Sequence, residues 1–184
     1  MQLNLLNIEA CEQFALTERL IITRMATVHA SHIEALNDKE YMAFSDQRHR
    51  THDVSSQRKY IESQNTRFLL LDLRLRPGAA EIPCSVGSIS VHFDPPNEKA
   101  DMGLLIIPEF KSRRFGREAW EATMSALFGY GVFKIEAGTP QDNMAMRYIM
   151  TQARMRIEGR RFNSFLLDGG KRTDVLLYGR TREA

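Results

Sequence analysis

Cysteine is scarce in this sequence of 184 residues: only Cys11 and Cys84 occur, and they lie far apart. Two such residues provide neither a disulfide framework nor the ligand spacing of a structural zinc site. No apolar run approaches the roughly 18 residues that a membrane span requires. The amino terminus also lacks the cationic segment and apolar core of a secretory signal. We therefore expect a cytoplasmic protein that binds no metal and no membrane.

An excess of charge of one sign is also missing, because 25 basic residues nearly balance 23 acidic ones and the net charge is +2. This balance does not call for nucleic acid as a partner. Hydrophobic residues make up 43% and charged residues 26%, as in ordinary globular proteins. The length suits one domain, which we expect over residues 1–184 with residues 1–16 as a flexible or docking arm. The sequence does not decide between a monomer and a homodimer.

The most informative stretch runs from Asp101 to Ala122. An apolar segment ends at Pro108, as a buried strand would, and a basic loop follows. Small and apolar residues then recur at helical spacing until Gly129. The stretch therefore predicts a strand, a loop and a helix. Four cations stand in the loop and at the start of the helix: Lys111, Arg113, Arg114 and Arg117.

Cations are unfavourable there, since the amino end of a helix already carries about half a positive charge. Free backbone N–H groups at a helix start hold phosphate well, and clustered arginine and lysine side chains strengthen such a site. The four cations therefore predict a bound anion. The alternative is that they extend into solvent as an ordinary charged surface, and the residues alone leave both possibilities open.

The order Gly-Leu-Leu-Ile-Ile-Pro-Glu-Phe, basic loop, Phe-Gly-x-Glu-Ala resembles the acyl-CoA motif of the Gcn5-related N-acetyltransferase (GNAT) superfamily, in particular its RimJ/RimL-like branch. In that family an Arg/Gln-x-x-Gly-x-Gly/Ala loop holds the CoA pyrophosphate. Lys111 takes the first position here, Arg114 replaces the first glycine, and Gly116 keeps its place. Arginine suits a positive φ poorly. We therefore expect Arg114 to turn outward and pair with a phosphate; the alternative is that the loop no longer holds CoA well. The resemblance implies acetyl-CoA as acyl donor and these binding residues: Leu105, Ile106, Lys111, Arg113, Arg114, Phe115, Gly116, Arg117 and Asn143.

The resemblance covers about residues 17–180 and implies the fold. Thr17 to Arg24 is similar to the family's opening strand, and Arg156 to Gly159 to its closing strand. We expect an α/β (α+β) fold of GNAT type, with a mixed, mostly antiparallel sheet of six to seven strands flanked by about four helices. Asn143 matches the asparagine that heads a late helix, whereas Met146 and Met150 hold the family's Ser and Tyr places. Methionine cannot protonate a leaving thiolate.

Local patterns predict the remaining elements. Thr27 is expected to cap a helix in which Phe44 still faces the core. A second helix is expected from about Val54 to Gln64, and a late helix to about Gln152, after a loop at 138–143. The expected strands are 68–73, 86–93, 101–107, 132–137 with Phe133 facing the core, 160–168 and 174–180. The last two are expected to be joined by a turn at 168–171.

The segment 41–52 is unusually rich in arginine and histidine. In the family that the chain resembles, this helix-loop-helix lies over the acceptor groove. The resemblance therefore implies that Arg48, His49 and His52 bind the acceptor, for example one with acidic or phosphate groups. A polar surface loop is the alternative. Metal binding is disfavoured because His49 and His52 have no third ligand nearby.

Acyl transfer to an amine needs a base, because a primary amine with a pKa of about 10 is mostly protonated at neutral pH. Asp101 is the candidate, since it stands where related proteins often carry Glu on this strand. Gly103 is expected to allow a bulge or bend that opens the sheet. The N–H groups of Leu105 and Ile106 are then expected to receive the pantetheine and polarise the thioester carbonyl. Alternatively, Asp101 is only a strand-end carboxylate that pairs with Lys99.

Three hypotheses about function follow. The first is an acetyl-CoA-dependent N-acetyltransferase that acts on a primary amine, either a protein N-terminus or a nucleotide-linked amino sugar. The second is a non-catalytic GNAT-fold module that senses CoA or binds proteins, which Arg114 and the two methionines favour. The third is nucleic-acid binding through residues 111–117. It is weakened by the lack of interleaved exposed aromatic residues beyond Phe115.

Overall fold

The structure, a computed structural model, describes residues 13–78 and 84–183. Most of the arm expected at 1–16 therefore lies outside the described residues. The helices are α2 (Ala30–Asn37), α3 (Val54–Glu62), α4 (Phe115–Gly129) and α5 (Met144–Gln152), with short 3₁₀ helices η1 (Pro95–Asn97) and η2 (Pro108–Phe110). The strands are β1 (Ala15–Leu16), β2 (Leu20–Arg24), β3 (Phe68–Leu75), β4 (Ser85–Asp94), β5 (Lys99–Ile106), β6 (Lys134–Pro140), β7 (Arg156–Leu166) and β8 (Arg172–Thr181). None of the described helices is long and apolar enough to cross a membrane.

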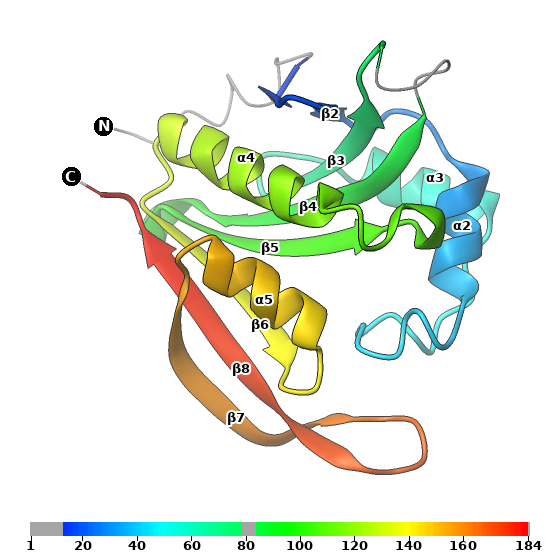
Figure 1. The fold of residues 1–184 in the computed structure, drawn as a ribbon, viewed down its shortest axis with the longest axis vertical. Helices are drawn as coiled ribbons and strands as arrows, with labels where there is room; N and C mark the ends of the chain where they lie inside the picture. Colours follow the sequence, from blue (N-terminus) through cyan, green and yellow to red (C-terminus); the bar gives the residue numbers. More distant parts are fainter. Residues whose placement is uncertain (1–12, 79–83, 184) are drawn as a thin grey trace.

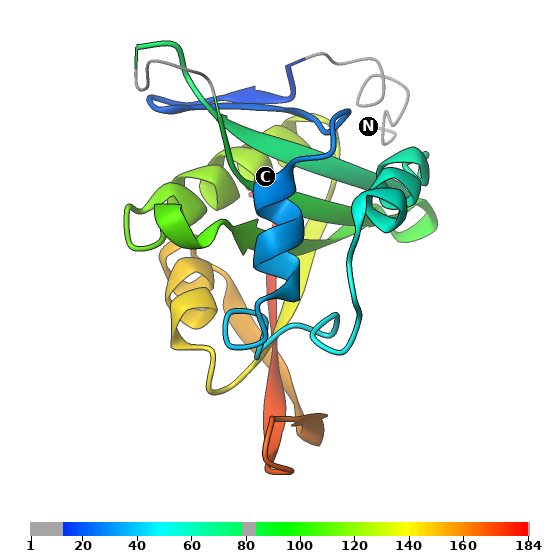
Figure 2. The same ribbon diagram turned by 90° about the vertical axis from the view of Figure 1, so that its right-hand side faces the viewer.

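All eight of these strands form one sheet in the order β1-β2-β3-β4-β5-β6-β8-β7. Each neighbouring pair is antiparallel except β5 and β6, which are parallel. Figure 1 shows α4 and α5 lying along the sheet, and Figure 2 shows them on one side of it with α3 on the other. The predicted fold class is confirmed. The sheet has more strands than expected because β1, only two residues long, pairs with β2.

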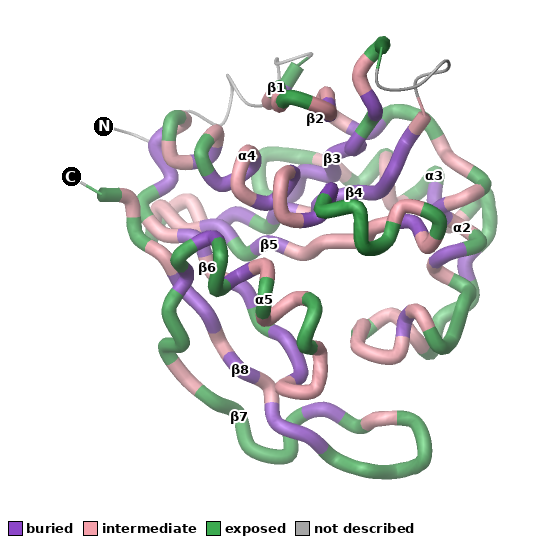
Figure 3. The backbone as a smooth tube through the Cα atoms, viewed as in Figure 1, coloured by how far each residue is buried: buried purple, intermediate pink, exposed green. Residues whose placement is uncertain are grey.

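The core lies between the central strands and α4. β3 is buried along its whole length except at Arg74, which accounts for its nearly continuous apolar run. Ala119 of α4 lets the helix approach the sheet closely, and the adjacent Trp120 is fully buried. Figure 3 shows burial concentrated in these elements, whereas β7 is exposed along most of its length. The core therefore fixes β5 and the start of α4, where the four cations gather.

The first helix is shorter than its sequence pattern predicts. α2 begins after His29 and has no side-chain cap, so the expected cap at Thr27 was wrong. His29 Nε2 instead lies 3.0 Å from Asp72 Oδ2 of β3, so a tertiary contact holds the residue that precedes the helix. Phe44, expected within this helix, lies in the turns that follow it. The second helix is confirmed, because α3 begins at the expected residue and ends two residues early.

Two expectations around β6 were wrong. Phe133 does not face the core: it precedes the strand and is 47% exposed, and its N–H donates to Glu98 O at 2.8 Å. The segment 138–140, expected to be a loop, continues the strand because β8 pairs with it as far as Pro140. Long-range pairing thus overrides the local signals of glycine and proline.

The chain ends in a long hairpin. The segments expected at 156–159 and 160–168 form one strand, β7, which is interrupted by two register shifts. The predicted turn after it is confirmed, since Leu167 N–H donates to Lys171 O at 2.8 Å and Gly169 and Gly170 have positive φ. β7 forms the edge of the sheet.

Candidate active site

The sheet opens between β5 and β6. The two strands pair only from Lys99 with Lys134 to Asp101 with Glu136. Beyond that point β5 stays with β4 and β6 stays with β8, so the strands diverge. The β5 edge from Met102 to Ile106 consequently has no strand partner among the described residues. The predicted opening is present, although β4 and β5 stay in register at Gly103 and form no bulge there.

The register decides which amides face the opening. Ile107 N–H donates to Val86 O of β4 at 2.9 Å. Directions alternate along an antiparallel strand, so the N–H groups of Met102, Leu104 and Ile106 point away from β4 and into the opening. The Leu105 N–H points toward β4, which means that the prediction was one residue off for this amide. The Ile106 N–H has the expected direction.

The loop between β5 and α4 has an unusual backbone. Ser112 and Arg114 both have left-handed conformations, with φ of 59° and 66°. Glycine adopts such angles freely, whereas they strain other residues. Arg114 is also the residue before the first turn of α4, and no side chain caps that turn. The first N–H groups of α4 are therefore available to an anion.

Three of the four cations around this helix start have no carboxylate partner among the described residues. Lys111 Nζ lies 4.0 Å from the ring centroid of Tyr41, and Arg113 lies over the ring of Phe110 at 5.5 Å. Arg114 is exposed and contacts no described side chain closely. Only Arg117 forms a local ion pair, with Glu121 at 2.9 Å. Positive charge at the loop is thus largely unneutralised.

Gly116 packs where α4 meets both β5 and α5. A Cβ atom at this position would lie 3.2 Å from Leu104 Cδ2, 3.2 Å from Ile149 Cδ1 and 3.3 Å from Ile106 Cγ1. These distances are tighter than most real Cβ contacts, so the neighbours would have to move. The glycine therefore allows close packing beside the opening.

Asp101 stands at the apex of the opening, on the last rung that joins β5 to β6. Its pKa is raised to about 6, first because the surrounding protein desolvates the carboxylate and second because Glu136 repels it; Arg161 and Lys99 act in the opposite direction. The side chain is nevertheless exposed to solvent within the opening. A carboxylate with these properties is a stronger base than an ordinary Asp.

The alternative pairing of Asp101 with Lys99 is not found. Lys99 Nζ instead pairs with Glu136 Oε2 at 3.1 Å, and Lys134 Nζ also pairs with Glu136, at 3.0 Å. Asp101 forms no ion pair or hydrogen bond with any residue that the structure describes. No group of three or more His, Cys, Asp or Glu in the same described ranges could hold a metal ion.

The late helix contributes a cap and packing. Asn143 Oδ1 accepts the Met146 N–H at 3.2 Å and so caps α5, as its sequence position predicts. Met150, in the family's Tyr place, is fully buried in the core. Tyr148, on the same helix, is 58% exposed.

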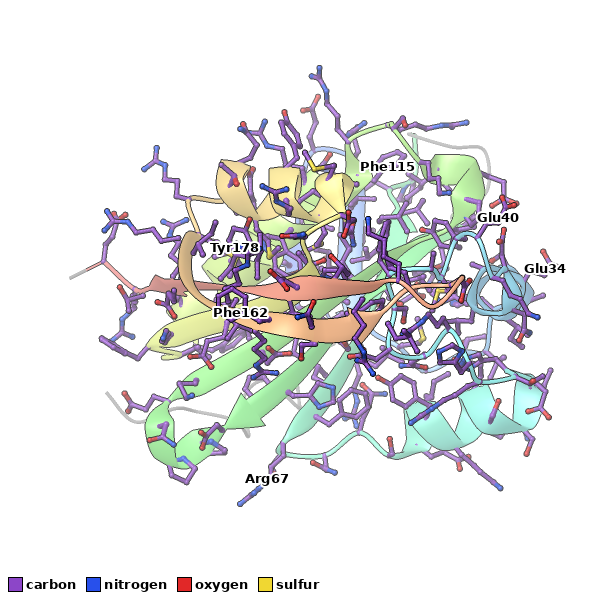
Figure 4. All side chains as sticks on the ribbon, turned by 90° about the horizontal axis from the view of Figure 1, so that it is seen from below. Glu34, Glu40, Arg67, Phe115, Phe162 and Tyr178 are labelled. Carbon is purple, nitrogen blue, oxygen red and sulfur yellow. The ribbon has the colours of Figure 1, made fainter. Side chains whose placement is uncertain are left out.

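The residues expected to bind the acceptor are only partly free. Arg48 donates to Leu166 O at 2.5 Å and lies over the Phe165 ring at 4.0 Å, so it ties its segment to the β7–β8 hairpin. His52 is buried, and its backbone N–H and C=O both bond to the side chain of Asn37. His49 is exposed. Figure 4 shows the hairpin reaching toward the helix that carries Glu34.

Sequence reasoning missed Tyr41. This side chain lies under Lys111, and its hydroxyl faces the backbone amide of Ile106. The pKa of Tyr41 is raised to about 12, chiefly by burial, although the Ile106 amide lowers it. The only sequence signal was an aromatic residue at the start of the Arg- and His-rich segment.

A family model for the acetyltransferase (GNAT) domain matches residues 19–156. The chain belongs to this family. The predicted recognition and the predicted enzyme class, an N-acetyltransferase, are thereby confirmed, and acetyl-CoA is the acyl donor of GNAT acetyltransferases. Among curated proteins, none matches the sequence.

Solved structures of GNAT acetyltransferases share the fold at low sequence identity. The ribosomal-protein α-N-acetyltransferase RimL in complex with coenzyme A has a TM-score of 0.77 and 17% identity, covering 92% of this chain and 98% of that one. RimJ of Mycobacterium smegmatis in complex with a CoA disulfide has a TM-score of 0.70 and 17% identity, covering 89% of this chain and 85% of that one. The microcin self-immunity acetyltransferase MccE in complex with acetyl-CoA and AMP has a TM-score of 0.72 and 16% identity, covering 90% of this chain and 94% of that one. Such likeness shows the fold alone.

Proposed function

We propose that this protein transfers the acetyl group of acetyl-CoA to a primary amine by direct attack of the amine on the thioester. The observation that carries the proposal is the opening between β5 and β6, where free strand amides, an uncapped helix start and an unpaired carboxylate adjoin one another. Each of these features matches one requirement of acyl transfer from a CoA thioester.

The donor is held along β5 and at the start of α4. The first amides of α4 bind the pyrophosphate, and Lys111, Arg113 and Arg114 add charge around it. Phe115 and Arg117 flank this point, and Gly116 lets α4 pack against β5. Along β5, the N–H groups of Leu104 and Ile106 donate to the pantetheine and thioester carbonyls, which stabilises negative charge on the oxygen. The side-chain amide of Asn143 completes the site from the β6 side.

Asp101 acts as the general base. With a pKa of about 6 the carboxylate is mostly ionised at neutral pH, and it accepts a proton from the ammonium group directly or through water. The amine nitrogen then attacks the carbonyl carbon, the C–N bond forms, and the C–S bond breaks. Met146 and Met150 carry no exchangeable proton. The thiolate therefore takes a proton from water or the second proton that the nitrogen loses as the amide forms, and Asp101 releases its own proton to solvent.

A protein N-terminus is the acceptor that we favour. RimL, to which the fold is similar, is described as an α-N-protein acetyltransferase of the ribosomal protein L7/L12. The amino-sugar alternative depended on the Arg- and His-rich segment, in which Arg48 and His52 are engaged in internal contacts. Exposed His49 remains available to an acceptor in either case.

Isothermal titration with acetyl-CoA tests the proposal first. Arg113→Ala should weaken binding, whereas Arg67→Ala, which removes a cation on the far side of the molecule from Phe115 (Figure 4), should not. Absence of binding at millimolar acetyl-CoA would remove the proposal. Thiol release with a panel of N-terminal peptides and amino sugars then identifies the acceptor.

The second candidate function is a non-catalytic CoA-binding module. The two methionines and the contact of Tyr41 with the donor groups favour it. It predicts acetyl-CoA binding without thiol release for every amine in the panel, an outcome that separates it from the enzyme.

A further inference from the structure

Tyr41 belongs to the segment that follows α2, but its side chain reaches the donor side of the opening. Its backbone N–H donates to Asp38 Oδ1 at 2.9 Å, which fixes the start of the turn. The ring is half-buried, and Lys111 Nζ lies 4.0 Å from its centroid, a distance typical of a cation–π contact. The neighbouring Met42 is buried and anchors the same turn in the protein.

The hydroxyl of Tyr41 lies near a second donor group. It faces the Ile106 amide, which the β4–β5 register directs into the opening. The phenol stays neutral over the physiological range because its pKa lies near 12. One side chain therefore covers both a phosphate-binding cation and a pantetheine-binding amide of the proposed donor site.

These two contacts cannot persist when the donor is bound. A backbone N–H has one proton to donate, so Ile106 cannot serve Tyr41 and a pantetheine carbonyl at full strength together. Lys111 likewise gains more from a phosphate, through a charge-assisted hydrogen bond, than from an aromatic face. The donor thus competes with Tyr41 for the same two groups.

We propose that Tyr41 is a gate on the donor channel: it closes the channel in the free protein, and acetyl-CoA displaces it. This inference rests on the proposed function, since it assumes that the donor binds along β5. The displaced residue belongs to the turn segment at 38–50, whose far end Arg48 joins to the hairpin. Donor binding therefore also loosens the segment beside the acceptor side of Asp101.

The test compares three variants by titration and stopped-flow binding of acetyl-CoA. Tyr41→Phe removes only the hydroxyl, and Tyr41→Ala removes the ring as well. Both should bind acetyl-CoA more tightly and faster, Tyr41→Ala by about three- to tenfold, because the hydroxyl near Ile106 and the cation–π contact with Lys111 no longer compete with the donor. Tyr60→Phe, a half-buried tyrosine of α3 that stacks on Phe68, is the matched control and should bind as the wild type does.

Hydrogen exchange on the wild-type protein keeps the test independent of how well a variant folds. Added acetyl-CoA should speed exchange in residues 38–50 while it slows exchange in β5 and at the start of α4. Unchanged or weaker donor binding in both Tyr41 variants, or no faster exchange in 38–50, overturns the gate while leaving the proposed function intact. Failure of the wild type to bind acetyl-CoA overturns the proposed function itself.

Discussion

At the scale of single residues, the charge of Asp101 depends on neighbours that act in opposite directions. Burial and then Glu136 raise its pKa to about 6, whereas Arg161 and Lys99 lower it. Arg161 belongs to β7, far along the chain, and its partner Val175 in the register lies on the same face of the sheet as Glu136. The β7–β8 hairpin therefore lowers the pKa of Asp101, the proposed base on β5.

Replacing Asp101 with Asn should abolish the base without removing the donor site. We expect kcat with the preferred amine to fall about 100-fold or more and acetyl-CoA affinity to stay within twofold of wild type, because the carboxylate does not contact the proposed phosphate site. Steady-state kinetics and calorimetry on one preparation measure both. An unchanged kcat would assign the base elsewhere.

Two neighbour variants should shift the pH profile in opposite directions. Arg161→Gln removes a charge that lowers the pKa of Asp101, so the acidic limb of kcat/KM should move to higher pH. Glu136→Gln removes a charge that raises this pKa, so the limb should move to lower pH. Arg74→Gln, on β3, is the control and should leave the limb in place. Shifts of the same sign in both variants would contradict the assignment of Asp101.

The loop between β5 and α4, in which Arg114 replaces the family's first glycine, gives a third prediction. Arg114→Gly relieves a residue at φ 66°, and this relief of about 1 kcal/mol or more offsets the lost charge, so donor affinity should stay similar or improve. Gly116→Arg should abolish donor binding, because even a Cβ atom there is crowded by β5 and α5. Titration with acetyl-CoA measures both, and a thermal melt checks that Gly116→Arg is folded. Equal affinities would argue against the loop as the phosphate site.

At the scale of elements, α4 depends on an acidic residue in its first turn. Glu118 accepts hydrogen bonds from Thr17 Oγ1 at 2.5 Å, from the Arg19 N–H at 3.0 Å and from Arg19 Nε at 2.7 Å. Burial alone would raise the pKa of Glu118, but the bonds from Thr17 and Arg19 lower it below its ordinary value. Glu118 thus attaches the start of α4 to the turn between β1 and β2, and it offsets part of the positive charge there.

Glu118→Gln should therefore lower the free energy of unfolding by about 2 kcal/mol at neutral pH. Since the folded-state pKa is depressed, this contribution is present above the unfolded pKa and disappears as pH falls through the folded value. Glu121→Gln, which breaks only an exposed pair with Arg117, should cost less than about 1 kcal/mol. Denaturant titrations at neutral and acidic pH measure the difference, and equal losses for the two variants would refute the anchoring role.

At the scale of the whole molecule, a single side chain joins two distant parts of the chain. The segment after α2 and the β7–β8 hairpin are joined by Arg48, through Leu166 O and the Phe165 ring. The hairpin contributes no residue to the proposed donor site, whereas the segment after α2 carries Tyr41, which lies under Lys111. In the proposed enzyme an acceptor passes between these two parts, and we infer that their contact sets the width of its path.

Arg48→Ala should free the hairpin tip. We expect faster hydrogen exchange at 165–171 and a several-fold higher KM for the acceptor. Acetyl-CoA affinity should stay the same or rise, because a freer segment makes Tyr41 easier to displace. Arg50→Ala, at an exposed position two residues away, is the control and should change neither. If Arg48→Ala weakens donor binding instead, Arg48 acts on the donor channel and not on the acceptor side.

Sequence alone predicted the parts of the site that depend on neighbours in the chain. The strand that ends at Pro108, the loop with four cations and the helix that ends at Gly129 were all found where expected, because each is specified by hydrophobic period and by local breakers. Asn143 capped its helix for the same reason. The sequence pattern was wrong about the helix cap at Thr27, because the contact of His29 with Asp72 holds the residue before the helix. It was also wrong about Phe133, whose N–H donates to Glu98 O.

The sequence by itself determined that a cationic loop lies between a buried strand and a helix, because period, charge and turn chemistry are local properties. Only the tertiary structure decided which amides face the opening, that Lys99 pairs with Glu136 and leaves Asp101 unpaired, and that Tyr41 covers Ile106 and Lys111. These facts follow from strand register and from packing between segments far apart in the chain. The free energy of such contacts depends on which residues meet in space, and no local pattern encodes that.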